Sequence, residues 1–217
     1  MSWLSQREIE QRARATLEFY EAHAEAFWEG TRDHDVSQNL DALLGELRGA
    51  PPYHVLDLGC GPGRDLIALS ARGCRAVGVE GAAAFVRMAR ESSGCEVWRQ
   101  SFLELDLPAG GFDGVFANAS LFHVPAQELP RVLSELRDCL TPGGVLFSSN
   151  PHGENQAGWS EGRYAVFHDW KAWRSFCLGA GFEEVRHYYR PPGRPRWRQP
   201  WLASLWRRPG GAEEESS

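Results

Sequence analysis

Three glycines at alternate positions form the most informative part of the sequence. An apolar run over 55–58 ends at Gly59, Gly61 and Gly63, and helical periodicity begins at Asp65. Glycines let the backbone turn sharply and approach a ligand closely, and the free amides at a helix start attract an anion. The segment therefore predicts a ligand-binding turn between a strand and a helix.

A carboxylate at the end of the next predicted strand supplies a second signal. Glu80 ends the apolar segment 75–80, where a carboxylate can accept hydrogen bonds from both hydroxyls of a ribose. The glycine spacing does not fit the dinucleotide fingerprint Gly-x-Gly-x-x-Gly, because its third glycine falls at Arg64 or Leu66. The pattern indicates a nucleoside-containing ligand and disfavours a nicotinamide oxidoreductase.

Apolar runs alternate with helical segments through the middle of the chain. Strands are predicted at 55–58, 75–80, 96–99, 112–117 and 144–148, and helices at 65–72, 82–90 and 129–140. This alternation predicts βαβ units and a largely parallel sheet with helices on both faces. A helix over 172–178 and two strands over 182–189 and 201–207 follow, whereas the polar and aromatic segment 150–170 is predicted to be an ordered loop.

The N-terminal part of the chain is predicted to be helical. Ser5 and Glu8 match a capping box at the start of a helix that runs to Phe27, and Ser37 is expected to cap a second helix. We expect residues 1–50 to be a helical cap within the same domain. Residues 51–208 would be the cofactor-binding catalytic domain, and 209–217 a disordered tail.

The acidic residue and alternating glycines, Asp57-x-Gly59-x-Gly61-x-Gly63, resemble motif I of class I S-adenosylmethionine-dependent methyltransferases. The resemblance is to the small-molecule type with an N-terminal helical cap, and it is clear over 53–147. It implies a three-layer, Rossmann-like α/β fold whose mostly parallel seven-stranded sheet ends in an antiparallel C-terminal hairpin. The implied cofactor is S-adenosyl-L-methionine.

The same resemblance implies which residues surround the cofactor. They are Asp57, Gly59, Cys60, Gly61, Gly63, Glu80, Gly81, Ser101, Phe102 and Asn118. Ser101 stands where the family usually carries an aspartate that contacts the adenine amino group. We expect the Ser101 hydroxyl, Gln100 or the Phe102 backbone to make that contact instead, and the Phe102 ring to cover the adenine.

The helical cap and the segment after the fifth strand are implied to cover the methyl acceptor. The expected acceptor-binding residues are Trp28, His34, Asn39, Asn150, Trp159, Arg163 and Tyr164. The catalytic candidates are Tyr20, His123 and His168, since a phenol or an imidazole can handle a proton near neutral pH. Arg163 can pair with a substrate carboxylate. A purely structural role remains the alternative for each of these side chains.

The composition narrows the class of protein further. The chain of 217 residues has a formal net charge of -6, which disfavours a dedicated nucleic-acid binder. Its five cysteines lack zinc-site spacing, so no metal is expected. Neither a signal peptide nor a membrane-spanning segment is recognised, and a cytoplasmic location is expected.

These observations predict an enzyme that methylates an N, S or O atom of a small molecule. Two alternatives stay open. The arginine- and tryptophan-rich stretch 186–208 allows methylation of RNA or protein, because arginine and aromatic side chains can bind single-stranded nucleic acid. A non-catalytic S-adenosylmethionine-binding protein would keep the glycine turn but lack an organised acceptor pocket. The sequence leaves the acceptor and the oligomeric state open.

Overall fold

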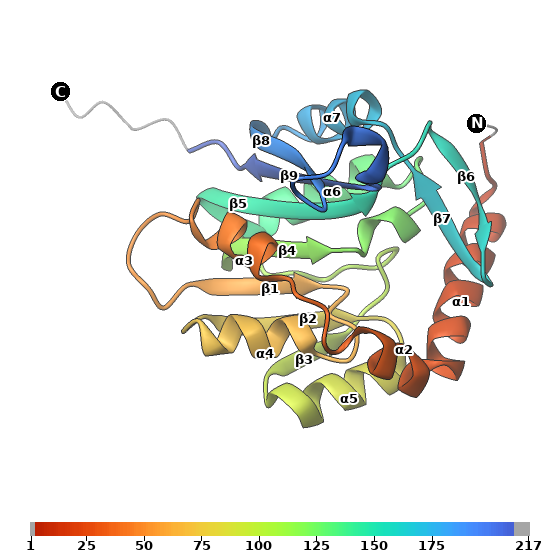
Figure 1. Ribbon diagram of the computed structural model, residues 1–217, viewed down its shortest axis with the longest axis horizontal. Helices are drawn as coiled ribbons and strands as arrows, with labels where there is room; N and C mark the ends of the chain where they lie inside the picture. The colour runs from red at the N-terminus through yellow and green to blue at the C-terminus, as the bar shows by residue number, and fades with distance from the viewer. Residues whose placement is uncertain (1–2, 211–217) are drawn as a thin grey trace.

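The main sheet has the largely parallel core that the βαβ pattern of the sequence predicts. The computed structural model describes residues 3–210, and its seven-stranded sheet has the order β3-β2-β1-β4-β5-β9-β8 (Figure 1). The parallel strands are β1 His54–Leu58, β2 Arg75–Glu80, β3 Glu96–Arg99, β4 Phe112–Asn118 and β5 Leu140–Pro151. β9, Trp201–Arg207, runs antiparallel to β5 and to β8, Glu183–Arg190. The predicted fold class is confirmed.

Helices cover both faces of this sheet and complete the three layers. On one face, α3 (Ser37–Leu44), α4 (Arg64–Ala71) and α5 (Ala83–Ser93) bury their apolar sides against the strands. On the other face, α6 (Leu129–Cys139) and α7 (Trp170–Gly179) do the same. Because both faces are covered, the central strands are mostly apolar, with Asp57 in β1 and Ser148 in β5 as buried polar exceptions.

The N-terminal helical region differs in two details from the prediction. Ser5 and Glu8 form the predicted capping box, but the helix is divided at His23 into α1 (Gln6–Ala22) and α2 (Ala24–Thr31). The prediction that Ser37 caps α3 is wrong. The Asp35 carboxylate accepts the Ser37 amide at 2.9 Å, so a side chain two residues earlier satisfies the free donor at the helix start.

The segment predicted as a loop over 150–170 contains a second, two-stranded sheet. β6 (Gln156–Ser160) and β7 (Arg163–Phe167) pair antiparallel around the two-residue turn Glu161-Gly162, whose φ angles are 49° and 81°. Two positive φ values give the turn a twist that matches a hairpin. The hairpin lies beside α1 (Figure 1) and is attached to it by the Tyr164 amide, which donates to Thr16 Oγ1 at 2.9 Å.

Two short 3₁₀ helices complete the secondary structure: η1, Leu121–His123, and η2, Arg196–Arg198. Within the described range 3–210, no helix is long and apolar enough to cross a membrane. All five cysteines are free thiols. Of the tail predicted to be disordered, 211–217 lies outside the described residues.

Candidate functional site

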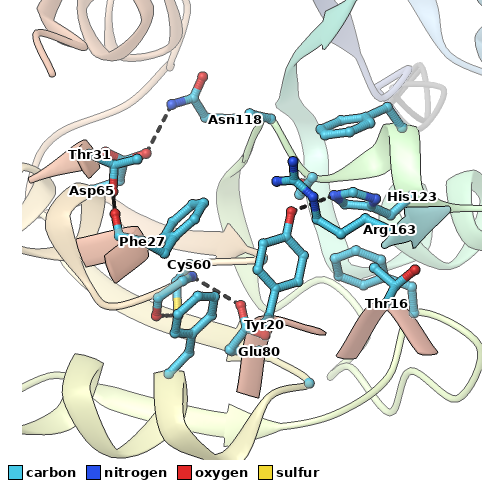
Figure 2. A pocket seen from close by; sticks show the side chains of 18 of the residues that line it. Thr16, Tyr20, Phe27, Thr31, Cys60, Asp65, Glu80, Asn118, His123 and Arg163 are labelled. Atoms are coloured by element: carbon cyan, nitrogen blue, oxygen red, sulfur yellow. Dashed lines mark hydrogen bonds between the residues drawn. The ribbon is translucent and has the colours of Figure 1, made fainter. Parts of the chain in front are cut away.

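A cavity of about 660 Å³ opens at the C-terminal ends of β1, β2 and β4 (Figure 2). Its floor is the turn after β1 and the ends of β2 and β4, and its cover comes from α1, α2 and the tip of the β6–β7 hairpin. The strands of a parallel sheet bring their polar ends to one edge, which is where ligands bind in this kind of fold.

The glycine turn needs glycine for conformation at all three positions. Gly59, Gly61 and Gly63 have φ angles of 73°, 52° and 99°, in the left-handed region that other residues adopt at a cost. A Cβ on Gly59 would lie 2.6 Å from the Ser120 Cβ, whereas one on Gly61 meets nothing closer than Phe27, at 3.8 Å. The backbone at Gly61 therefore faces open cavity.

Glu80 fixes the shape of this turn. Its carboxylate is buried, and it accepts the Gly61 amide at 3.0 Å and the Ala82 amide at 2.9 Å. Burial raises the pKa of Glu80, and the two amides oppose that rise by stabilising the charged form. The side chain still lines the cavity, so it can support the turn and face a ligand together.

Asp57 and Ser120 are polar groups without internal partners. Asp57 lies beneath the turn and does not line the cavity. Its burial raises its pKa well above the usual value, and the negative charge of Asp65 raises it further. Within the described part of the chain, Asp57 Oδ2 and the buried Ser120 Oγ have no hydrogen-bond partner. Ser120 does line the cavity, so its hydroxyl can bond a ligand there.

A chain of hydrogen bonds connects the helical cap to the start of α4. The Tyr188 hydroxyl donates to Asn39 Oδ1 at 3.1 Å, and the Asn39 amide donates to Asn118 Oδ1 at 3.0 Å. Asn118 in turn donates to Asp65 Oδ2 at 3.0 Å. Arg64 closes the chain with an ion pair to Asp65 at 2.6 Å, and it also donates to the carbonyl of Thr31, the last residue of α2. These residues are called the Asn39 network below.

Tyr20 and His123 form a buried pair on the opposite wall. Tyr20 Oη lies 2.7 Å from His123 Nε2, and His123 Nδ1 lies 2.7 Å from the Tyr164 carbonyl oxygen. A carbonyl only accepts, so Nδ1 carries the proton in the neutral ring and Nε2 accepts from the Tyr20 hydroxyl. Burial lowers the pKa of His123 to about 4. Burial also raises the pKa of Tyr20, which the nearby Arg163 opposes. Both groups are therefore neutral at physiological pH.

Arg163 stands beside this pair. Figure 2 shows its guanidinium next to the Tyr20 hydroxyl, inside the cavity. The guanidinium stacks on the rings of Phe19 and Tyr20, with 5.0 and 5.6 Å to the ring centroids, and it pairs with Glu161 at 2.6 Å. The two stacked rings hold a fixed positive charge at the cavity wall.

The structure brings most of the predicted site residues to this cavity. The predicted residues that line it are Gly59, Cys60, Gly61, Glu80, Gly81, Ser101, Phe102, Asn118, Tyr20, His123, Trp28, His34 and Arg163. Ser101 is partly engaged, because its hydroxyl accepts the Leu103 amide at 3.2 Å.

The other predicted residues lie elsewhere. Those that do not line the cavity are Asp57, Gly63, Asn39, Asn150, Trp159, Tyr164 and His168. Gly63 packs α4 on α5, since a Cβ there would lie 2.8 Å from Ala89 Cα. Trp159 is exposed on the hairpin, and His168 is buried beside the rings of Trp173 and Phe176. Asn39 acts within its network, and Tyr164 contributes its backbone to the site.

Several lining residues were missed by the sequence analysis. Arg64 and Asp65 follow the glycines directly, and their position at a helix start was an available signal. Phe85 packs against Tyr20, with the ring centroids 5.5 Å apart. Arg190 and Trp201 come from the C-terminal hairpin, and nothing in the local sequence indicates that they reach this cavity.

The strand order is that of the Rossmann-like methyltransferase fold, and the glycine turn and the acid at the end of β2 stand at its ligand-binding edge. The comparisons with known proteins agree. The family described as "Methyltransferase domain" matches residues 55–144, which contain the turn, Glu80 and Asn118. Residues 55–144 therefore resemble this methyltransferase family.

Individual relatives support the same assignment. A trans-aconitate 2-methyltransferase from Azoarcus sp. (strain BH72) is 39% identical over 106 residues, which cover 47% of this chain and 40% of the relative. One from Paracidovorax citrulli (strain AAC00-1) is 36% identical over 120 residues, covering 52% and 45%. The chain thus matches less than half the length of these relatives.

A solved structure shows the same fold over nearly the whole chain. It is 1,6-didemethyltoxoflavin-N1-methyltransferase from Burkholderia thailandensis, with a TM-score of 0.76 at 20% identity, and it covers 96% of this chain and 93% of its own. Among residues 3–210, no group of histidine, cysteine and acidic side chains is arranged to hold a metal ion.

Breaking the Asn39 network should destabilise the protein. Asn39 is 0% exposed, so Asn39→Ala leaves the Tyr188 hydroxyl and Asn118 Oδ1 without a partner and should cost about 2–4 kcal/mol in the free energy of unfolding. Urea denaturation measures this. Asp41→Ala, on the exposed side of the same helix, should change stability by less than about 0.5 kcal/mol. Equal effects of the two substitutions would contradict the network.

The buried His123 should make stability depend on pH. Its folded-state pKa of about 4 lies below the ordinary value of 6.5, so the unfolded chain binds the proton first as the pH falls. The contribution of His123 to the free energy of unfolding is fully present above pH 6.5 and is lost as the pH falls toward 4. Between pH 7 and pH 5 the loss is about 2 kcal/mol. In denaturation curves at those two pH values, His123→Gln should remove that part of the difference. The exposed His54→Gln should keep it, and an unchanged difference in His123→Gln would argue against a buried neutral ring.

Proposed function

We propose that this chain is an S-adenosyl-L-methionine-dependent methyltransferase that acts on an N, S or O atom of a small molecule. The observation that carries the proposal is the glycine turn held open by Glu80 at the edge of the cavity. The relatives' names support a small acceptor, since they are enzymes of trans-aconitate and of 1,6-didemethyltoxoflavin. The proposed active unit includes residues 1–50 as a cap of the same domain.

The residues at the turn fit the proposed cofactor. Gly61 leaves space where any other residue would place a side chain, and the buried Ser120 hydroxyl has no partner among residues 3–210. We assign Gly59, Cys60 and Gly61 to the methionine portion, Glu80 and Gly81 to the ribose hydroxyls, and Ser101 and Phe102 to the adenine. When bound, the sulfonium supplies an activated methyl group.

The opposite wall would hold the acceptor. Trp28, His34 and Arg163 line it together with the Tyr20–His123 pair. Holding the attacking atom in line and excluding water accounts for much of the rate in such a transfer. His168 and Asn150 lie outside the cavity lining, and we give them no role in the reaction.

The Tyr20–His123 pair gives the site a path for the proton that the acceptor loses. The Tyr20 oxygen can accept that proton while its own hydroxyl proton moves to His123 Nε2, 2.7 Å away. An oxygen that has gained a methyl group while still carrying its proton holds that proton weakly. A base as weak as His123, whose pKa is about 4, can therefore still take part.

The alternatives have less support from the described residues. Methylation of RNA or protein would use the arginines of 186–208, but the chain carries a net charge of -6. A non-catalytic cofactor-binding protein would not need an organised Tyr20–His123 pair at the acceptor wall. The free thiols of all five cysteines are compatible with the proposed cytoplasmic location.

Removing the Glu80 carboxylate tests the cofactor site. Glu80→Ala should weaken binding of S-adenosylmethionine by about 1–3 kcal/mol, because the ribose loses an acceptor and the turn loses its anchor at Gly61. Isothermal calorimetry measures the change. Glu80→Gln keeps one acceptor oxygen, so its affinity for the cofactor should lie between those of the natural protein and Glu80→Ala. If Glu80→Ala binds as tightly as the natural protein, Glu80 is not part of the site.

Removing the Tyr20 hydroxyl tests the proton path. Tyr20→Phe keeps the ring that packs on Phe27 and Phe85. It should lower kcat by about 10²-fold or more while leaving the Kd of the cofactor unchanged. Transfer of labelled methyl groups to fractionated metabolites, and separately to RNA and protein, provides the assay. A kcat equal to that of the natural protein would remove Tyr20 from catalysis.

A further inference from the structure

The acceptor wall carries positive charge from two arginines. Arg163 and Arg190 both line the cavity. Among the described residues, the carboxylate paired with Arg163 is Glu161, which is 78% exposed on the hairpin turn. Arg190 has no carboxylate within 4 Å in the described range and is held by neutral oxygens, at 3.0 Å from Gln38 Oε1 and 3.5 Å from the Asp35 carbonyl.

The three carboxylates that line the cavity are already engaged. Asp65 pairs with Arg64, Glu80 accepts two backbone amides, and Asp35 accepts the Ser37 amide at the surface. The Tyr20–His123 pair beside Arg163 is neutral. A ligand beside Arg163 therefore meets a cation whose carboxylate partner lies outside the cavity lining. Arg190 adds positive charge and also interacts with the Asp35 carboxylate.

The apolar lining around these arginines favours a ligand whose charge pairs with theirs. Apolar and aromatic side chains such as Leu17, Phe85 and Phe122 surround the cavity, and an ion in such surroundings is stable only when it is paired. A cationic acceptor would be repelled by Arg163 and Arg190. A carboxylate on the acceptor can pair with Arg163 in competition with the exposed Glu161.

We propose that the methyl acceptor is an organic anion whose carboxylate binds the Arg163 guanidinium, with Arg190 contributing positive charge from the C-terminal hairpin. The planar edge of a guanidinium matches the two oxygens of a carboxylate, and the existing bond to Glu161 shows that this edge takes one. The inference rests on the proposed function and specifies its substrate class. The carboxylate is the binding handle, and the attacking N, S or O atom is a second group on the acceptor.

Binding of matched probes tests the inference. Benzoate and benzamide, and fumarate and fumaramide, are titrated by calorimetry into the protein saturated with S-adenosylhomocysteine. We expect at least one carboxylate to bind about tenfold or more tightly than its amide, since a hydrogen bond to a charged group is worth that much. Arg163→Gln should remove the preference, and Arg163→Lys should keep part of it.

Two variants serve as controls. Arg174→Gln removes the same charge from an exposed pair with Glu184, 2.6 Å long and outside the cavity lining, and it should retain the preference. Glu161→Gln removes the surface partner of Arg163 and should not weaken carboxylate binding. All variants should bind S-adenosylhomocysteine as the natural protein does, which shows that they are folded.

The outcomes separate this inference from the proposed function. Failure of the natural protein to bind S-adenosylhomocysteine would overturn the proposed function. If S-adenosylhomocysteine binds but every carboxylate binds no better than its amide, or if Arg163→Gln keeps the preference, the anionic acceptor is wrong while the cofactor site stands. Tighter binding of phenylphosphonate than of benzoate would also overturn the carboxylate assignment.

Discussion

The two hydrogen bonds that Glu80 accepts are the constraint on which the rest of the site depends. They tie the Gly61 amide, on the turn after β1, to the Ala82 amide at the start of α5, through one buried carboxylate at the end of β2. A buried charge is costly unless it is paired or hydrogen-bonded. The fold thus satisfies Glu80 only when the glycine turn has its open shape, and the stability of the charge and the geometry of the cavity support each other.

The Asn39 network extends this rigidity to the cover of the cavity. It joins residues from β8, α3, β4 and α4, and Arg64 reaches the end of α2 at Thr31. The side-chain amides of Asn39 and Asn118 can each take only one orientation in this network, because each oxygen accepts a hydrogen bond and each nitrogen donates one. One continuous set of bonds therefore links the floor of the cavity to α2 in its cover.

Features that depend on neighbouring residues could be predicted from the sequence, whereas contacts between distant segments could not. The alternating strands and helices, the glycine turn and Glu80 could be predicted. Hydrophobic periodicity and the need for glycine in a tight turn are set by residues that are close together in the chain. The hairpin β6–β7 was missed because its strands are short and its Glu161-Gly162 turn lacks the usual Asn-Gly signal. Arg190 was missed for another reason. It lies far from the glycine turn in the chain, and only the strand order of β9 and β8 brings it to the cavity.

The two walls of the cavity differ in how they treat charge, and this difference has a chemical consequence. Beside the glycine turn, Asp65 and Glu80 are buried acids stabilised by Arg64 and by backbone amides. On the wall proposed to bind the acceptor, burial keeps Tyr20 and His123 neutral, and Arg163 pairs with the exposed Glu161 outside the cavity lining. The proposed anionic acceptor would therefore be drawn to Arg163, because the neutral pair beside it offers no competing charge. An acceptor held by such a charge is oriented before any bond changes, and orientation lowers the barrier of a bimolecular transfer.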